Sequence, residues 1–60
     1  MLKISFDTTN AAFRDYDSGD LNTYEVIRIL NYIANAISEG RTSGKAIDYN
    51  GNYVGDWSLD

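Results

Sequence analysis

The stretch from Asn22 to Gly40 constrains the fold most, because it carries both the start signal and the stop signal of a single helix. Asn22 is a residue type that often caps a helix N-terminus. Glu25 stands three positions later, where a capping-box acid can bond back to the N–H of the cap. Gly40 is placed to adopt the left-handed conformation that ends many helices. No proline or glycine interrupts the stretch, which therefore predicts one continuous helix.

This helix is expected to carry one apolar stripe and one polar side. With about 3.6 residues per turn, an apolar stripe recurs at every third or fourth position. The stripe consists of Val26, Leu30, Ile33 and Ile37. A coiled-coil seam is the competing interpretation, but the run covers only about two and a half heptads, which is too short. The stripe therefore predicts a helix that lies on a sheet.

The segments before the helix predict one strand followed by an irregular loop. Residues 2–7 alternate strictly between apolar and polar side chains, which is typical of a half-buried strand. Residues 8–20 are rich in turn-forming and acidic side chains, and Phe13 is expected to plug one end of the core. The expected core comprises Leu2, Ile4, Phe6, Phe13, Leu21, Val26, Leu30, Ile33, Ile37, Ile47, Val54, Trp57 and Leu59.

Residues 45–54 carry a strong β-hairpin signal around Asn50 and Gly51. Asp48 and Asn50 suit the first and third positions of a type I turn, and Gly51 can then be left-handed in a bulge. A two-residue type I′ turn centred on Asn50 and Gly51 is the alternative. We prefer the type I turn, because it matches the residue preferences at both positions.

The preferred turn pairs Ile47 with Tyr53. It leaves a parity problem in the last strand, because two large apolar side chains that are both expected in the core do not fall on the same face. Strict alternation would place Val54 and Trp57 on opposite faces. A bulge at Gly55 would let both side chains face inward, and this is the arrangement that we expect.

Together the segments predict an α+β fold of order β-α-β-β, in one small domain over residues 1–60. The sheet is expected to have three mainly antiparallel strands, with the amphipathic helix packed on one face. The last strand carries the most aromatic side chains, and we expect it to lie between the other two.

The composition argues against an enzyme. Neither histidine nor cysteine is present, which excludes Ser-His and Cys-His nucleophiles, disulfides, and thiolate or imidazole metal sites. Carboxylate pairs exist, but they are interpreted as solvated surface, because a chain of 60 residues has little depth for a pocket. We therefore expect no catalytic residues and no cofactor.

Residues 15–20 form an acidic loop that invites comparison with a calcium site. In an EF-hand loop that began at Asp15, the fifth, sixth and twelfth positions would be Gly19, Asp20 and Val26. None of the three fits the pattern. Weak divalent-ion binding is the alternative, but an ordinary acidic loop is favoured and no metal site is expected.

The outer side of the helix predicts a protein-binding face. Tyr24, Arg28 and Tyr32 are spaced four apart, so their side chains are neighbours, and tyrosine and arginine are enriched at interface hot spots. The predicted face is completed by Asn31 and Asn35. The competing interpretation is that the tyrosine rings stack on Arg28 and lean on the rim of the core.

Two boxes give the chain a resemblance to a group of small uncharacterised proteins of bacteriophages and prophages. Residues 7–13 are similar to an Asp-Thr-Asp-Asn-Ala-Ala-Phe box of that group, with Thr9 in place of an aspartate. Residues 48–57 are similar to its terminal Asn-Gly-Asn hairpin, and the apolar helix lies between the two boxes. The resemblance implies a phage origin and a β-α-β-β fold, and it implies no site residues.

These observations lead to the expectation of a small, non-catalytic viral protein that binds a host or phage protein, for instance to inhibit a host factor or a defence component. A self-associating accessory protein, as a homodimer, is the alternative. The net charge of −4, without a basic stripe, argues against direct nucleic-acid binding. An acidic mimic of nucleic acid is less favoured, because the charge is modest. No apolar run suits a signal peptide or a membrane span, so we expect a soluble protein of the host cytoplasm.

Overall fold

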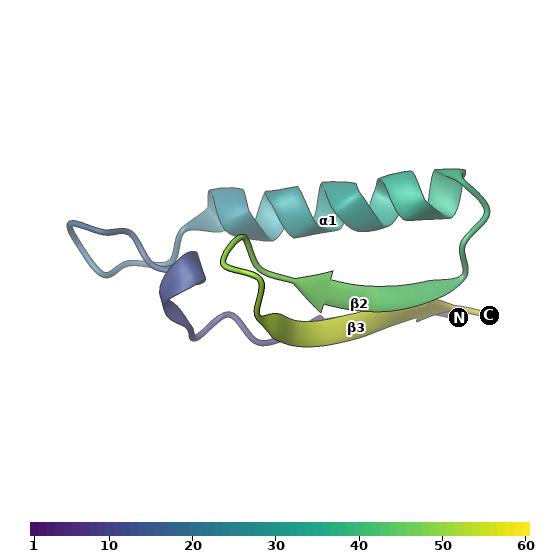
Figure 1. Ribbon diagram of the computed structural model, residues 1–60, viewed down its shortest axis with the longest axis horizontal. Coiled ribbons are helices and arrows are strands. Elements are labelled where there is room, and N and C mark those ends of the chain that lie inside the picture. Colours follow the sequence, from purple (N-terminus) through teal and green to yellow (C-terminus); the bar gives the residue numbers. More distant parts are fainter.

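The computed structural model describes residues 1–60 and has a helical layer lying on a sheet (Figure 1). The elements are β1 (Leu2–Phe6), a 3-10 turn η1 (Ala11–Phe13), α1 (Thr23–Ser38), β2 (Ser43–Ile47) and β3 (Tyr53–Leu59). The sheet has the order β1-β3-β2, and both pairs of neighbouring strands are antiparallel. The predicted α+β fold and the central place of the last strand are confirmed.

Both ends of α1 are fixed by local hydrogen bonds. At the start, the side chain of Asn22 accepts from the N–H of Tyr24 at 3.0 Å. At the end, Gly40 is left-handed with φ +92°, and the N–H of Arg41 reaches the carbonyl of Ala36 at 3.1 Å. This 6→1 bond and the bond from the Gly40 N–H to the carbonyl of Ile37 form a Schellman cap. The predicted cap and stop residues are confirmed.

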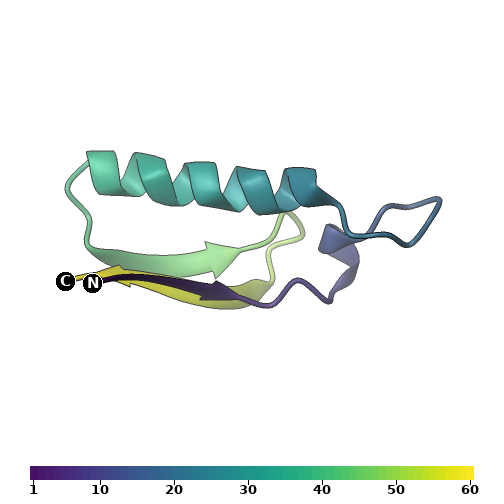
Figure 2. The same cartoon turned by 180° about the vertical axis from the view of Figure 1, so that it is seen from behind.

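The capping box that was expected from Glu25 is wrong. The N–H of Asn22 donates instead to the carbonyl of Phe13, which ties the start of the helix to η1. Glu25 turns inward and is only 5% exposed. Phe13 is fully buried and plugs this end of the core, as predicted. The loop between η1 and α1 projects beyond the sheet (Figure 2).

The hairpin between β2 and β3 has the preferred turn. The N–H of Gly51 donates to the carbonyl of Asp48 at 2.9 Å, and Gly51 has φ +88°. No other residue of this turn has positive φ, which rules out the type I′ alternative, because that turn needs positive φ at Asn50 as well. Ile47 pairs with Tyr53, as predicted.

A bulge in β3 resolves the parity problem. Ala46 pairs with Gly55, and the next pair skips Val54, which is the extra residue. Val54 is therefore turned inward, and it packs against the core together with Trp57, which is 2% exposed. The expected bulge is confirmed.

The helix is rolled about its axis relative to the predicted stripe. Its buried residues are Glu25, Ile29, Ile33 and Ala36, so Ile33 alone is common to both sets. Leu30 is 42% exposed, and its place in the core was predicted wrongly. The roll follows from Glu25, whose inward contacts select the side of the helix that faces the sheet. The small side chain of Ala36 extends that buried side to the other end of the helix.

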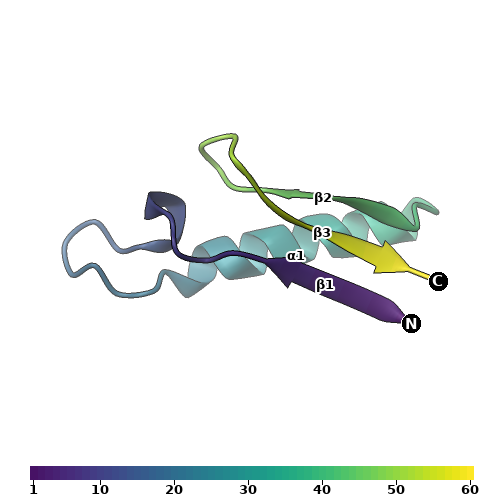
Figure 3. The same ribbon diagram turned by 90° about the horizontal axis from the view of Figure 1, so that it is seen from below.

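Four further residues of the expected core lie at its edges and are exposed: Leu2, Ile4, Leu21 and Ile47. Leu21 precedes the helix, and Ile47 lies at the bulge. Leu2 and Ile4 are exposed because α1 crosses the sheet obliquely toward β2. The helix therefore leaves the N-terminal half of β1 uncovered (Figure 3).

Candidate functional site

The residues predicted to form a protein-binding face are accessible on α1. Tyr24 is 82% exposed and Tyr32 is 50% exposed. Asn31 and Asn35 are also exposed. Since these side chains follow one another at helical spacing, they form a continuous polar and aromatic surface on α1, which begins beside the buried side of the helix and continues round to its outer side.

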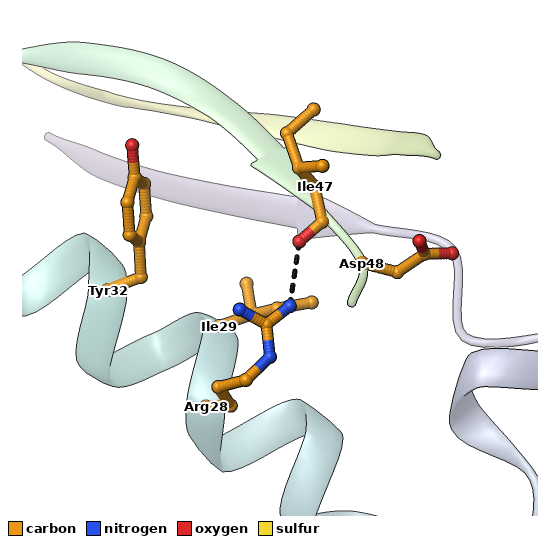
Figure 4. A pocket seen from close by; sticks show the side chains of 5 residues that line it. All are labelled: Arg28, Ile29, Tyr32, Ile47 and Asp48. Carbon is orange, nitrogen blue, oxygen red and sulfur yellow. Dashed lines mark hydrogen bonds between the residues drawn. The ribbon is translucent and has the colours of Figure 1, made fainter. Parts of the chain in front are cut away.

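Arg28 belongs to this surface, but its guanidinium group is fixed by three hydrogen bonds. Its Nε and Nη2 atoms donate to the two carboxylate oxygens of Glu25, at 2.6 and 3.0 Å. Nη2 also donates to the carbonyl of Ile47 at 2.9 Å (Figure 4). The cation–π contact in the chain joins Lys45 to the ring of Tyr53, not Arg28 to a helix tyrosine. Arg28 therefore ties α1 to the end of β2.

Glu25 is a buried carboxylate that links α1 to the hairpin between β2 and β3. Besides the two bonds from Arg28, its Oε2 atom accepts from the N–H of Tyr49 in the hairpin at 2.8 Å. The bond from Arg28 lowers the pKa of Glu25 below its usual value, and the bond from Tyr49 adds to this effect, while burial opposes it. Glu25 is thus ionised at neutral pH and holds the helix start against the hairpin.

Asp48 is the second buried carboxylate, and it organises the hairpin turn. Its Oδ1 atom accepts from the backbone N–H groups of Asn50 and Asn52, both at 2.9 Å. Its Oδ2 atom accepts from the side-chain amides of Asn10 at 2.8 Å and Asn52 at 3.2 Å. Burial, the largest single influence, raises the pKa of Asp48, but these hydrogen bonds together outweigh it and leave the pKa lowered. The carboxylate has a structural role.

Two hollows lie along one flank of α1, and the first of them borders the end of β2. The first has a volume of about 170 Å³ and is lined by Arg28, Ile29 and Tyr32 of the helix and by Ile47 and Asp48 of the hairpin (Figure 4). The second has a volume of about 310 Å³ and is lined by Tyr32, Asn35, Ala36, Glu39 and Arg41. Tyr32 borders both hollows, so we treat them together as the helix–β2 groove.

The structure brings only part of the predicted face to this groove. Arg28, Tyr32 and Asn35 line it, whereas Tyr24 and Asn31 lie farther round the helix. Six residues that line the groove do not belong to the predicted face: Ile29, Ala36, Glu39, Arg41, Ile47 and Asp48. In the sequence, Asp48 stands out only as the first residue of the predicted turn. That position indicates a structural role and not a place in a binding site. Ile47 was expected in the core, and the structure places it at the exposed edge of the core beside the helix.

In the acidic loop, the carboxylate of Asp15 is engaged by neighbouring backbone groups. The Oδ1 atom of Asp15 accepts from the N–H groups of Asp17 and Ser18, at 2.9 and 3.3 Å, as in an ordinary Asx turn. No three acidic side chains converge on a point where they could hold a metal ion. The single α-helix is too short and too polar to cross a membrane.

Comparison with known proteins does not place the chain in a family. No protein-family model matches it, and no curated protein or solved structure matches it either. Its role is therefore inferred from its own surface, where the tyrosines of α1 and the helix–β2 groove are the features that a partner could use.

Proposed function

We propose that this chain is a small phage-encoded, non-catalytic protein that acts by binding a protein of the host or of the phage, such as a host factor or a defence component. The main support for this proposal is that two tyrosine side chains on one helix are exposed. The exposed fraction is 82% for Tyr24 and 50% for Tyr32. Tyrosine contributes a large, rigid contact area at low entropic cost, which is why it is frequent at binding hot spots. Tyr32 also stands between the two hollows of the groove, where a partner side chain could dock.

The charge of the chain indicates what kind of partner surface would fit. The net charge is −4, and of the two arginines that line the groove, Arg28 is already paired with Glu25. The face around Tyr24, Asn31 and Asn35 is therefore neutral and hydrogen-bonding, within an acidic protein. A partner with a basic rim and an apolar or amide-rich centre would be attracted to it. We place the encounter in the host cytoplasm.

The proposal is tested by affinity capture from a lysate of a bacterial host. Wild type is compared with the double variant Tyr24→Ala/Tyr32→Ala, with captured proteins identified by mass spectrometry and then purified to measure binding. The matched control is Tyr16→Ala/Tyr49→Ala, because these two tyrosines are 101% and 64% exposed but do not belong to α1. We expect the helix variant to lose the partner and the control to keep it. Equal retention by both variants would refute this face as the binding site.

The phage origin depends on the two boxes at residues 7–13 and 48–57, and it has a separate test. Sequencing the genome around the gene should reveal phage genes on both sides. A position inside a conserved cluster of bacterial metabolic genes would contradict the origin without touching the binding proposal.

A further inference from the structure

Strand β1 is incompletely covered on its inner face. Leu2 is 47% exposed and Ile4 is 38% exposed, although both point to the side of the sheet that carries the helix, as their partner Trp57 does. The helix runs obliquely away from this half of β1 (Figure 3). Leu30 lies on the opposite flank of α1 from Arg28 by helical spacing, so it faces the β1 side, and it is 42% exposed. The apolar layer is therefore open at this edge.

The same strand has a free hydrogen-bonding edge. The N–H of Asp7 donates to the carbonyl of Val54, and alternate residues of an antiparallel strand bond to the same neighbour. Lys3 and Ser5 are therefore directed toward β3, whereas the N–H and C=O groups of Leu2, Ile4 and Phe6 are directed outward. Such an edge is a template for a further strand.

The opposite edge of the sheet is protected. On β2, the carbonyl of Ile47 is occupied by Arg28 at 2.9 Å, and the bulge opposite Ile47 disturbs the ladder. No bulge, proline or inward-pointing charge blunts β1. The contrast singles out β1 as the edge that can accept another strand.

We propose that β1 pairs antiparallel with β1 of a second copy of this chain, about a two-fold axis through Ser5, to give a continuous six-stranded sheet. This axis places Lys3 of one copy opposite Asp7 of the other, and it does so twice. An axis through Lys3 would oppose two lysines, and an axis through Ile4 would leave both charges unpaired. The strand is thus complementary to itself, as a two-fold interface requires.

The pairing also closes the open apolar layer. Both helices lie on the same face of the joined sheet. On that face Ile4 of each copy stands opposite Phe6 of the other, Leu2 lies diagonal to the same Phe6, and Leu30 of each copy faces the seam from its helix. A standard stable interface buries about 800 Å² per partner, and one short strand with three apolar side chains covers less. We therefore expect a reversible dimer with a dissociation constant in the micromolar range. The dimer uses a different surface from the helix–β2 groove, so either proposal can fail alone.

Sedimentation equilibrium over a wide concentration range tests the dimer. We expect wild type to shift from monomer to dimer, and Ile4→Lys to weaken association by tenfold or more, because a charge would enter the joined apolar layer. The matched control is Ile47→Lys, since Ile47 is 40% exposed on the other edge strand. A wild type that stays monomeric at millimolar concentration would overturn the proposal, as would a loss of association in Ile47→Lys alone.

Single cysteines test the register without depending on a loss of signal. The chain has no cysteine, so Ser5→Cys introduces the only thiol. Across the proposed axis the two Cα atoms form a non-hydrogen-bonded pair about 4.5 Å apart, which a disulfide can span. Mild oxidation should give a covalent dimer of Ser5→Cys, and Ser43→Cys on β2 is the control. Faster cross-linking of Ser43→Cys would place the contact at the wrong edge and refute the register.

Discussion

At the scale of single residues, two buried carboxylates determine how the parts of this small chain meet. Glu25 joins the start of α1 to the hairpin, and Asp48 joins the hairpin to Asn10. A sequence pattern assigns Glu25 to a capping box, because its spacing from Asn22 fits. In the structure the N–H of Asn22 is already taken by Phe13, so the carboxylate is free to turn inward. Its partners come from distant segments, and local spacing does not reveal them.

Replacing the buried acid should show its contribution to stability. We expect Glu25→Gln to lower the free energy of unfolding at pH 7 by about 1–3 kcal/mol, because the bonds to Arg28 and Tyr49 lose their charge. Urea denaturation measures this change. The control is Glu39→Gln, which is exposed and should stay within about 0.5 kcal/mol of wild type. Equal effects of the two changes would contradict the role given to Glu25.

The contribution of Glu25 should also depend on pH. Its pKa is lowered in the folded chain, so the stabilisation is fully present above the pKa of an unfolded glutamate, at about 4.3. It is lost as the pH falls through the lower, folded pKa. The stability difference between wild type and Glu25→Gln should therefore be largest near neutral pH and shrink in acid. A difference that is constant from pH 7 down to pH 2 would exclude the charged form as its source.

Gly55 is a position where only hydrogen fits. An added Cβ atom would overlap the backbone of Ser5 and Phe6 in β1. We expect Gly55→Ala to destabilise the fold by about 3 kcal/mol or to prevent folding, as measured by thermal unfolding. At Gly19, with φ +75° and open space around the Cβ position, the same change should cost only about 1–2 kcal/mol. A milder effect at Gly55 than at Gly19 would show that β1 and β3 are not this close.

At the scale of elements, sequence periodicity predicted the position of α1 well but did not predict which side of the helix faces the sheet. The stripe and the buried side overlap, since Val26 and Ile37 are half-buried, but the centre has moved from Leu30 to Ile29. Isoleucine and leucine are present on several sides of this helix, so an apolar count cannot fix the roll. The roll is decided by Glu25 and by the two ends of the helix.

A matched pair of substitutions tests the orientation. Ile29 is 1% exposed and Ile27 is 50% exposed on the same helix. Ile29→Ala should lower the stability by about 2–5 kcal/mol through loss of burial and a residual cavity, whereas Ile27→Ala should stay within about 0.5 kcal/mol. Chemical denaturation of both variants measures the difference. A larger cost at Ile27 would mean that the helix presents another side to the sheet.

At the scale of the whole molecule, most of the fold could be predicted and most of the site could not. The helix caps, the type I turn and the bulge each depend on neighbours in sequence or on strand alternation, and the strand order could be predicted from the aromatic content of the last strand. The exposed edge at Leu2 and Ile4 depends on the oblique course of the helix, which no local pattern encodes. The helix–β2 groove depends on Arg28 reaching Ile47, a contact between residues 19 apart in the sequence.

The most direct test of the proposed function is chemical-shift mapping of the isotope-labelled chain by NMR, with the purified captured partner added in steps. We predict that the largest shifts fall on the backbone and side-chain groups of Tyr24, Arg28, Asn31, Tyr32 and Asn35. The peaks of Tyr16, which is 101% exposed and lies outside α1, should stay in place. Shifts confined to the acidic loop, or no shifts on α1 at saturation, would contradict binding through this face.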